Sequence, residues 1–192
     1  MSVTLQKGGN VSLAKASPGL RLVLIGLGWD ARTTQGVEFD LDASAFLLDA
    51  RDRVLADEYF VFYNNLVSPD GSVEHTGDNR TGEGDGDDEA IKVALAEVPA
   101  AVQRIVVVVS IHDAVARHQN FGQVRNAFMR IVDAETEVEV ARFDLSEEAG
   151  IETTMIFGEL YRRDADWKFR AVGQGYSSGL EGVARDFGVN LA

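Results

Sequence analysis

The densest group of side chains that could do chemistry lies in residues 78–89. Six carboxylates, three glycines and one arginine occupy this segment and give it a local charge of −5. Carboxylates this close together repel one another unless a cation neutralises them. Calcium suits this composition because it takes about six to eight oxygen ligands from flexible loops, and glycine lets backbone carbonyls turn inward. The segment therefore predicts a calcium-binding loop.

The residues alone leave two ordinary explanations of this segment open. Acids are favoured at the start of a helix by capping and by the helix dipole, and we predict a helix over residues 88–98. A solvated acidic loop without a metal is also common. The segment is not an EF-hand, because with Asp78 at the first ligand position Arg80 and Gly82 would occupy positions that need oxygen ligands.

A second group of oxygen ligands lies on a strand predicted over residues 36–50. Asp40 and Asp42 alternate with apolar residues, so both carboxylates share one face of the strand, about 7 Å apart at their Cα atoms. Carboxylates at this spacing can reach one cation or two neighbouring cations. The alternative is an ordinary solvated strand face, which produces the same alternation.

Further oxygen ligands follow two other predicted strands. Asp30 follows Gly28-Trp29 at the end of a strand over residues 20–27, and Asn64 and Asn65 follow a strand over residues 59–63. Carboxylate and amide oxygens suit calcium, although the same residue types are common in turns. Three strand ends rich in oxygen ligands, together with the acidic loop, indicate one metal-binding region.

Composition excludes several other kinds of chemistry. The chain has no cysteine, which removes disulfides, thiolate metal sites and thiol redox reactions. Its net charge of −13 argues against nucleic acid, and against anionic lipid unless a cation bridges the two. The three histidines have no zinc-ligand spacing, and we find no pair of nucleophile and base. We therefore do not expect an enzyme.

The elements that must position these ligands are mainly strands. Many short apolar segments are separated by turn signals, which predicts an all-β fold: a β-sandwich of two antiparallel sheets in one domain over residues 1–192. Only residues 88–98 and 180–187 have helical character. A weak internal two-fold repeat relates residues 23–50 to residues 106–134. The longest apolar run, residues 105–109, is too short to span a membrane. The N-terminal residues do not resemble a hydrophobic signal segment, so we expect a cytoplasmic protein.

Several motifs, in order along nearly the whole chain, carry a resemblance to a known family. They are Leu5-Gln6-Lys7-Gly8, Gly28-Trp29-Asp30, the block from Phe39-Asp40-Leu41-Asp42 to Phe46, Phe62-Tyr63-Asn64-Asn65, the block from His75 to Glu89, and Gly173-Gln174-Gly175-Tyr176. Together they resemble the TerD family of tellurium-resistance and stress-response proteins. The blocks 40–46 and 78–89 are the most specific, and neither departs from the family pattern.

The resemblance implies a calcium-binding β-sandwich that holds two Ca²⁺ ions. Carried over motif by motif, the implied metal ligands are Asp30, Asp40, Asp42, Asn64, Asn65, Asp78, Asp87, Asp88 and Glu89, with backbone carbonyls of Gly82 and Gly84. It also implies a role in resistance to tellurite. A chain without cysteine cannot reduce tellurite with a thiol, and tellurite is an anion, so we expect an indirect, bacterial stress-response role.

We therefore expect a calcium-dependent binding or sensing module. It would present a surface to a protein partner, in the cytoplasm or at the inner face of the membrane. Two alternatives stay open: a metal-dependent hydrolase, since carboxylate-bound metals cleave phosphoesters, and a module that calcium bridges to a membrane surface.

Overall fold

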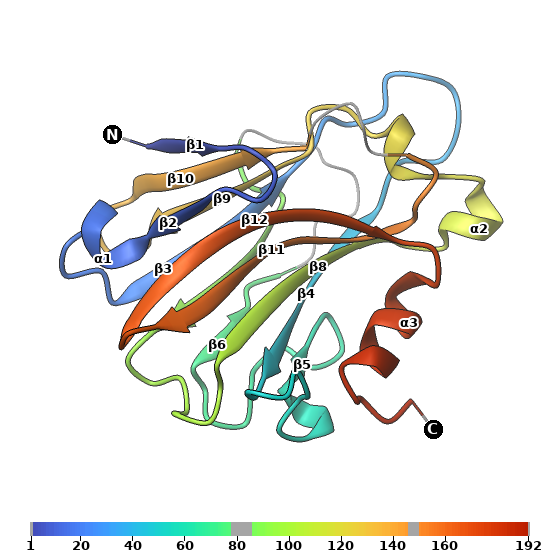
Figure 1. Ribbon diagram of the computed structural model, residues 1–192. Helices are drawn as coiled ribbons and strands as arrows, with labels where there is room; N and C mark the ends of the chain where they lie inside the picture. Colours follow the sequence, from blue (N-terminus) through green and yellow to red (C-terminus); the bar gives the residue numbers. More distant parts are fainter. Residues whose placement is uncertain (1, 78–85, 146–149, 192) are drawn as a thin grey trace.

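The computed structural model describes residues 2–77, 86–145 and 150–191, which form two six-stranded sheets packed face to face (Figure 1). Sheet A has the strand order β1 (Val3–Leu5), β10 (Val138–Asp144), β9 (Phe128–Asp133), β3 (Leu22–Gly28), β7 (Glu89–Ala94) and β6 (Val73–His75). Sheet B has the order β2 (Asn10–Ser12), β12 (Asp166–Tyr176), β11 (Thr154–Arg163), β8 (Arg104–Ile111), β4 (Leu41–Leu48) and β5 (Phe60–Val61). Neighbouring strands are antiparallel except β1 and β10, which are parallel.

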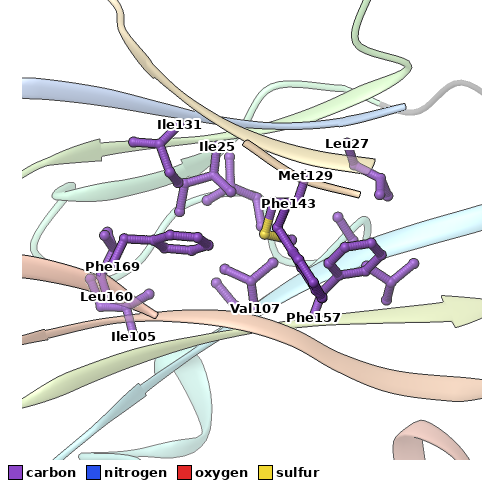
Figure 2. Close-up of a cluster of buried hydrophobic side chains, with 14 of the residues drawn as sticks. Ile25, Leu27, Ile105, Val107, Met129, Ile131, Phe143, Phe157, Leu160 and Phe169 are labelled. Atoms are coloured by element: carbon purple, nitrogen blue, oxygen red, sulfur yellow. The ribbon is translucent and has the colours of Figure 1, made fainter. Parts of the chain in front are cut away.

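The core fills the space between the two sheets. Alternate residues of each strand point inward, as the two-residue period of a strand requires: Val23, Ile25 and Leu27 from β3 meet Val107 and Val109 from β8. Figure 2 shows this layer, in which aromatic rings from β10, β11 and β12 lie among aliphatic side chains of both sheets. The two sheets therefore share one continuous buried cluster.

Five short helical segments connect or cover the strands of the described chain. They are α1 (Leu13–Ala16), α2 (Ala114–Arg117), α3 (Gly179–Asp186) and the 3₁₀ turns η1 (Asp57–Tyr59) and η2 (Phe121–Gln123). α3 packs on the outer face of sheet B (Figure 1), where Val183 and Phe187 join a second buried cluster with Phe46 and Val106. No helix in the described ranges is long and apolar enough to span a membrane.

The predicted β-sandwich is confirmed, and so is the helix over residues 180–187, which is α3. The helix predicted over residues 88–98 is wrong, because Glu89–Ala94 is strand β7. Ile91 and Val93 alternate into the core, and β7 pairs with β3 on one side and β6 on the other. This pairing outweighs the helix-start signal of the preceding acids, whose intrinsic preference is weak.

The predicted strand over residues 36–50 is shorter in the structure, where β4 covers Leu41–Leu48. Asp42 therefore lies in the strand, and Asp40 precedes it. The weak internal repeat has mixed support: β3 and β8 are both central strands, each in its own sheet. The ladder registers differ, however, since Phe46 pairs with Val106 whereas its repeat counterpart Phe128 pairs with Gly28 rather than with Val23.

Candidate metal centre

Glu89 marks the point where the apolar core ends and the acidic segment begins. It is the first residue of β7 and points inward like Ile91 and Val93, and its side chain is only 3% exposed. Its Oε2 accepts a hydrogen bond of 2.6 Å from the backbone N–H of Ala43 in β4. Glu89 of sheet A thus reaches across the sandwich to sheet B and joins the two sheets at this end.

His75 faces the same carboxylate from strand β6. Its Nε2 lies 3.5 Å from Oε2 of Glu89, and both side chains are buried. The Nδ1 of His75 accepts a hydrogen bond from the N–H of Gly77, so in the neutral ring the proton sits on Nε2 and points at Glu89. Within the described residues, Oε1 of Glu89 has no hydrogen-bond donor.

Burial raises the pKa of Glu89 to about 7. The His75 side chain and the N–H of Ala43 act in the opposite direction and favour the ionised form, while the nearby charge of Asp42 raises the pKa further. Glu89 and Asp42 are therefore close enough to interact although they belong to different sheets. A positive charge close to both carboxylates would stabilise their ionised forms.

Asp40 and Asp42 line a cavity of about 280 Å³ at the same end of the molecule. Both residues are only 9% exposed, which argues against the alternative of an ordinary solvated strand face. His112 and Arg117 also line this cavity, and Nδ1 of His112 lies 3.6 Å from Oδ2 of Asp42. The backbone N–H of His112 donates to the carbonyl oxygen of Asp40, which fixes the two segments side by side.

Asp87 and Asp88 point away from that cavity, toward sheet A. Oδ1 of Asp87 accepts from Nε of Arg130 at 2.7 Å, and Oδ2 accepts from Nη2 at 3.1 Å, a two-pronged ion pair on the outer face of the sheet. Oδ2 of Asp88 accepts from the backbone N–H of Trp29 at 3.0 Å. Burial raises the pKa of Asp88, and the charge of Asp87 adds to that effect. The side chains of the consecutive acids Asp87, Asp88 and Glu89 therefore point in three different directions.

The carboxyl group of Asp87 lies directly over Gly26 of β3. A Cβ atom at Gly26 would come within 2.2–2.3 Å of all three carboxyl atoms, so only glycine leaves room for this arrangement. Gly26 pairs with Arg130 in the sheet ladder, which places the guanidinium beside the carboxylate. The glycine is therefore part of the local structure that holds Asp87.

We expect Gly26→Ala to displace Asp87 from Arg130 and to lower the free energy of unfolding by about 1.5–3 kcal/mol, the range for a hydrogen bond to a charged group. Urea unfolding of Gly26→Ala, Asp87→Ala and the double variant checks this. With Asp87 already truncated, Gly26→Ala should cost less than about 0.5 kcal/mol. Equal costs in both backgrounds would show that Asp87 does not depend on the glycine.

The remaining predicted ligands of the described chain have other contacts than the acids Asp40, Asp42, Asp87, Asp88 and Glu89. Asp30 is exposed at the end of β3 and accepts from the side-chain amide of Asn126 at 2.6 Å. Asn65 donates its amide N–H groups to the carbonyl oxygens of Glu58 and Phe60, which is a turn-stabilising role. Asn64 is exposed next to Tyr63, a residue that lines the cavity of Asp40 and Asp42. The predicted ligands Asp78, Gly82 and Gly84 lie outside the described residues.

In the three described ranges, no three acidic or histidine side chains converge closely enough to hold a metal by themselves. The structure instead forms two acidic groups at one end of the sandwich: Asp40, Asp42 and Glu89 around the start of β4, and Asp87 and Asp88 against β3. Sequence reasoning missed the roles of His75, His112 and Arg130. His75 ends β6, His112 follows β8 and Arg130 lies within β9, and the sequence does not give the strand pairing that brings these side chains to the acids.

Comparison with known proteins agrees with this architecture. A family model described as the TerD domain matches residues 1–187. The chain is 62% identical to the tellurium resistance protein TerD of Serratia marcescens and 52% identical to general stress protein 16U of Bacillus subtilis (strain 168), over all 192 residues and the whole of each relative. The crystal structure of a homologue of telluride resistance protein (TerD) from Streptomyces coelicolor A3(2) superposes with a TM-score of 0.70. It shares 26% identity and covers 86% of this chain and 96% of that one.

The fold and the acidic end define a β-sandwich protein that carries buried carboxylates at one end of its two sheets. Among such proteins, this chain belongs to the TerD family of tellurium-resistance and stress proteins. The resemblance seen in the motifs is thereby confirmed.

Proposed function

We propose that the protein is a calcium-binding module whose acidic end binds Ca²⁺ and then a partner. The observation that carries the proposal is the burial of Asp40, Asp42 and Glu89 where the acidic segment 78–89 joins the sandwich. Buried carboxylates are costly unless a positive charge compensates them, and the chain already has a net charge of −13. Hard oxygen ligands without cysteine suit calcium.

The donor set fits the ion. Asp40, Asp42 and Glu89 would supply carboxylate oxygens to one ion, and Asp87 and Asp88 could serve a second, which agrees with the two separate groups in the structure. Because the described carboxylates do not converge, the proposal requires further ligands from the residues 78–85, which carry three more acids. Binding would link these residues to both sheets, so calcium would supply order to this end of the molecule.

Exposed apolar side chains lie around the same end and support a role in binding. Tyr63 is 43% exposed and Val37 is 55% exposed, and both line the cavity of Asp40 and Asp42. Val115 in α2, 83% exposed, lines an adjoining cavity of about 490 Å³ together with Asp42 and His112. A surface that combines neutralised acids with exposed apolar residues suits a protein partner. The proposal places this interaction in the cytoplasm or at the membrane face.

In this proposal the protein acts by binding and not by catalysis, and a link to tellurite is indirect because the chain offers no thiol. One observation favours a second candidate, a metal-dependent phosphoester hydrolase. His112 and Arg117 line the same cavity as Asp40 and Asp42, so a base and a cation lie near carboxylates that could hold a metal.

Calorimetric titration of metal-stripped protein with CaCl₂, in the presence of excess Mg²⁺, tests the proposal. We expect saturable binding that weakens at least about tenfold in Asp42→Asn and in Glu89→Gln, a change of about 1.4 kcal/mol or more. Glu181→Gln is the matched control, because it removes one carboxylate from the exposed Glu181–Arg185 pair of α3.

Absence of calcium binding in the wild-type protein would contradict the proposal, as would equal weakening by Glu181→Gln. Turnover of p-nitrophenyl phosphate by the manganese-loaded protein, lost in His112→Gln, would instead support the hydrolase. Binding of the calcium-loaded protein to anionic vesicles, without a protein partner, would support the membrane alternative.

A further inference from the structure

A cavity of about 560 Å³ lies at the other end of β7, away from the acidic groups. It is bounded by α1, by the turn after β7 and by the hairpin between β11 and β12. Its walls are mostly apolar, with Leu13, Leu20, Val98 and Trp167 among them. Its size falls within the range of about 300–1,000 Å³ that is common for small-molecule sites.

Arg162 brings a positive charge into this apolar wall. Its Nε donates to the carbonyl oxygen of Val102 at 2.9 Å, and its Nη2 donates to those of Val98 at 2.9 Å and Pro99 at 3.3 Å. Its guanidinium lies over the ring of Trp167, 4.3 Å from the centroid. These contacts hold the side chain in one position and leave the Nη1 group without an acceptor in the described part of the chain.

Arg162 lacks the carboxylate partner that two other partly buried arginines have. Arg104 and Arg130 each contact a carboxylate, whereas no carboxylate of the described residues lies within ion-pair distance of Arg162. Burial without a counter-ion lowers the pKa of Arg162. A partly desolvated, fixed guanidinium without a counter-ion is well placed to receive an anionic group.

The groups around Arg162 indicate what else the ligand must have. Trp167 and Leu20 are apolar residues that line the cavity, and Arg21 adds a second cation whose side chain is 76% exposed. Arg21 already pairs with Glu135, so it contributes less to a ligand than Arg162 does. Asp166, the one acid that lines the cavity, disfavours a ligand with several negative charges.

We propose that this cavity is a binding site for a small organic anion, which places an aromatic or apolar body against Trp167 and one carboxylate or phosphate group on Arg162. The site is independent of the acidic end, since β7 separates the two. Nε and Nη2 of Arg162 are committed to backbone carbonyls, so Nη1 would donate to the carboxylate or phosphate oxygen, and an apolar wall supplies affinity for the body of the ligand.

Titration with 8-anilinonaphthalene-1-sulfonate, an aromatic anion that fluoresces on binding, tests the proposal in the presence of EDTA. Two variants address the site: Arg162→Gln removes the charge, and Ala100→Phe fills the cavity from an exposed wall position. Arg163→Gln is the matched control, because Arg163 is exposed next in sequence and does not line the cavity. Thermal unfolding of each variant establishes that it is folded.

We expect one saturable site in the wild-type protein, binding at least about tenfold weaker in both site variants and unchanged binding in Arg163→Gln. Benzoate or phenyl phosphate should displace the probe, and the more effective of the two identifies the anionic group; benzyl alcohol should not displace it. If Arg162→Gln fails to fold, Ala100→Phe decides the result alone. Absence of saturable binding, unchanged binding in Ala100→Phe, or displacement by benzyl alcohol at the same concentration would overturn the proposal.

Discussion

Metal-stripped protein should lose about 3 kcal/mol of unfolding free energy through Glu89 as the pH rises from about 4.5 to about 7. The pKa of Glu89 is about 7 in the folded protein and has an ordinary value of 4.5. Between these values the folded state binds more protons than the unfolded state, so stability falls with rising pH. The magnitude follows from about 1.4 kcal/mol for each pKa unit. Below pH 4.5 and above pH 7 this contribution is constant.

Urea unfolding of the wild-type protein and of Glu89→Gln across this pH range measures the effect as a difference between the two. Glu89→Gln should be less sensitive to pH because glutamine stays neutral. The difference should shrink when Ca²⁺ is added, since a bound cation would favour the ionised carboxylate. Identical pH profiles of the two proteins, or a wild-type profile that rises more steeply than that of Glu89→Gln, would contradict this account.

Truncation of Phe46 should have the largest effect on stability, a loss of about 3–5 kcal/mol in Phe46→Ala. The Phe46 ring is fully buried on the outer face of sheet B. It stacks on Phe60 with centroids 4.3 Å apart, and it contacts Phe187 at 5.3 Å. One ring therefore joins β4, β5 and the end of α3, and its loss leaves a cavity between them.

Urea unfolding followed by far-ultraviolet circular dichroism measures this loss. Phe46→Leu is the matched control, and it should retain most of the stability because it keeps much of the buried volume. We also expect faster amide exchange in α3 of Phe46→Ala than in β3, since the cavity forms beneath the helix. A loss below about 1 kcal/mol would show that α3 can close over the missing ring.

The sequence was sufficient for the strands of the core because their period is strong. Residues 105–109 are all β-branched and form most of the central strand β8, which covers Arg104–Ile111. It was misleading for residues 89–94, where consecutive acids are typical of a helix start. Their actual role depends on long-range contacts, with Ala43 for Glu89, Trp29 for Asp88 and Arg130 for Asp87. Local patterns do not contain such contacts.

The site shows the same division. Residue type and alternation were enough to select Asp40 and Asp42, and both are buried at the acidic end. The opposite directions of the Asp87 and Glu89 side chains could not be predicted. Asp87 contacts Arg130 on the outer face of sheet A, whereas Glu89 contacts Ala43 of sheet B, and both contacts depend on the tertiary fold. The spacing of His75 in the sequence does not indicate a zinc site. Its Nε2 nevertheless lies 3.5 Å from Oε2 of Glu89, because β6 pairs with β7. Sheet topology, and not spacing in the sequence, brings these two residues together.

The N-terminal strands β1 and β2, which lie in different sheets, have a consequence for how the chain folds during synthesis. β1 pairs with residues 141–143 in sheet A, and β2 pairs with residues 168–170 in sheet B. Residues 3–12 are synthesised more than 120 residues before their partners, residues 141–143 and 168–170. Contacts this distant in sequence form slowly, because the loop must close before they contribute stability. β1 and β2 therefore stay without their strand partners until β10 and β12 have been synthesised, and in that interval a chaperone or a second nascent chain can pair with them.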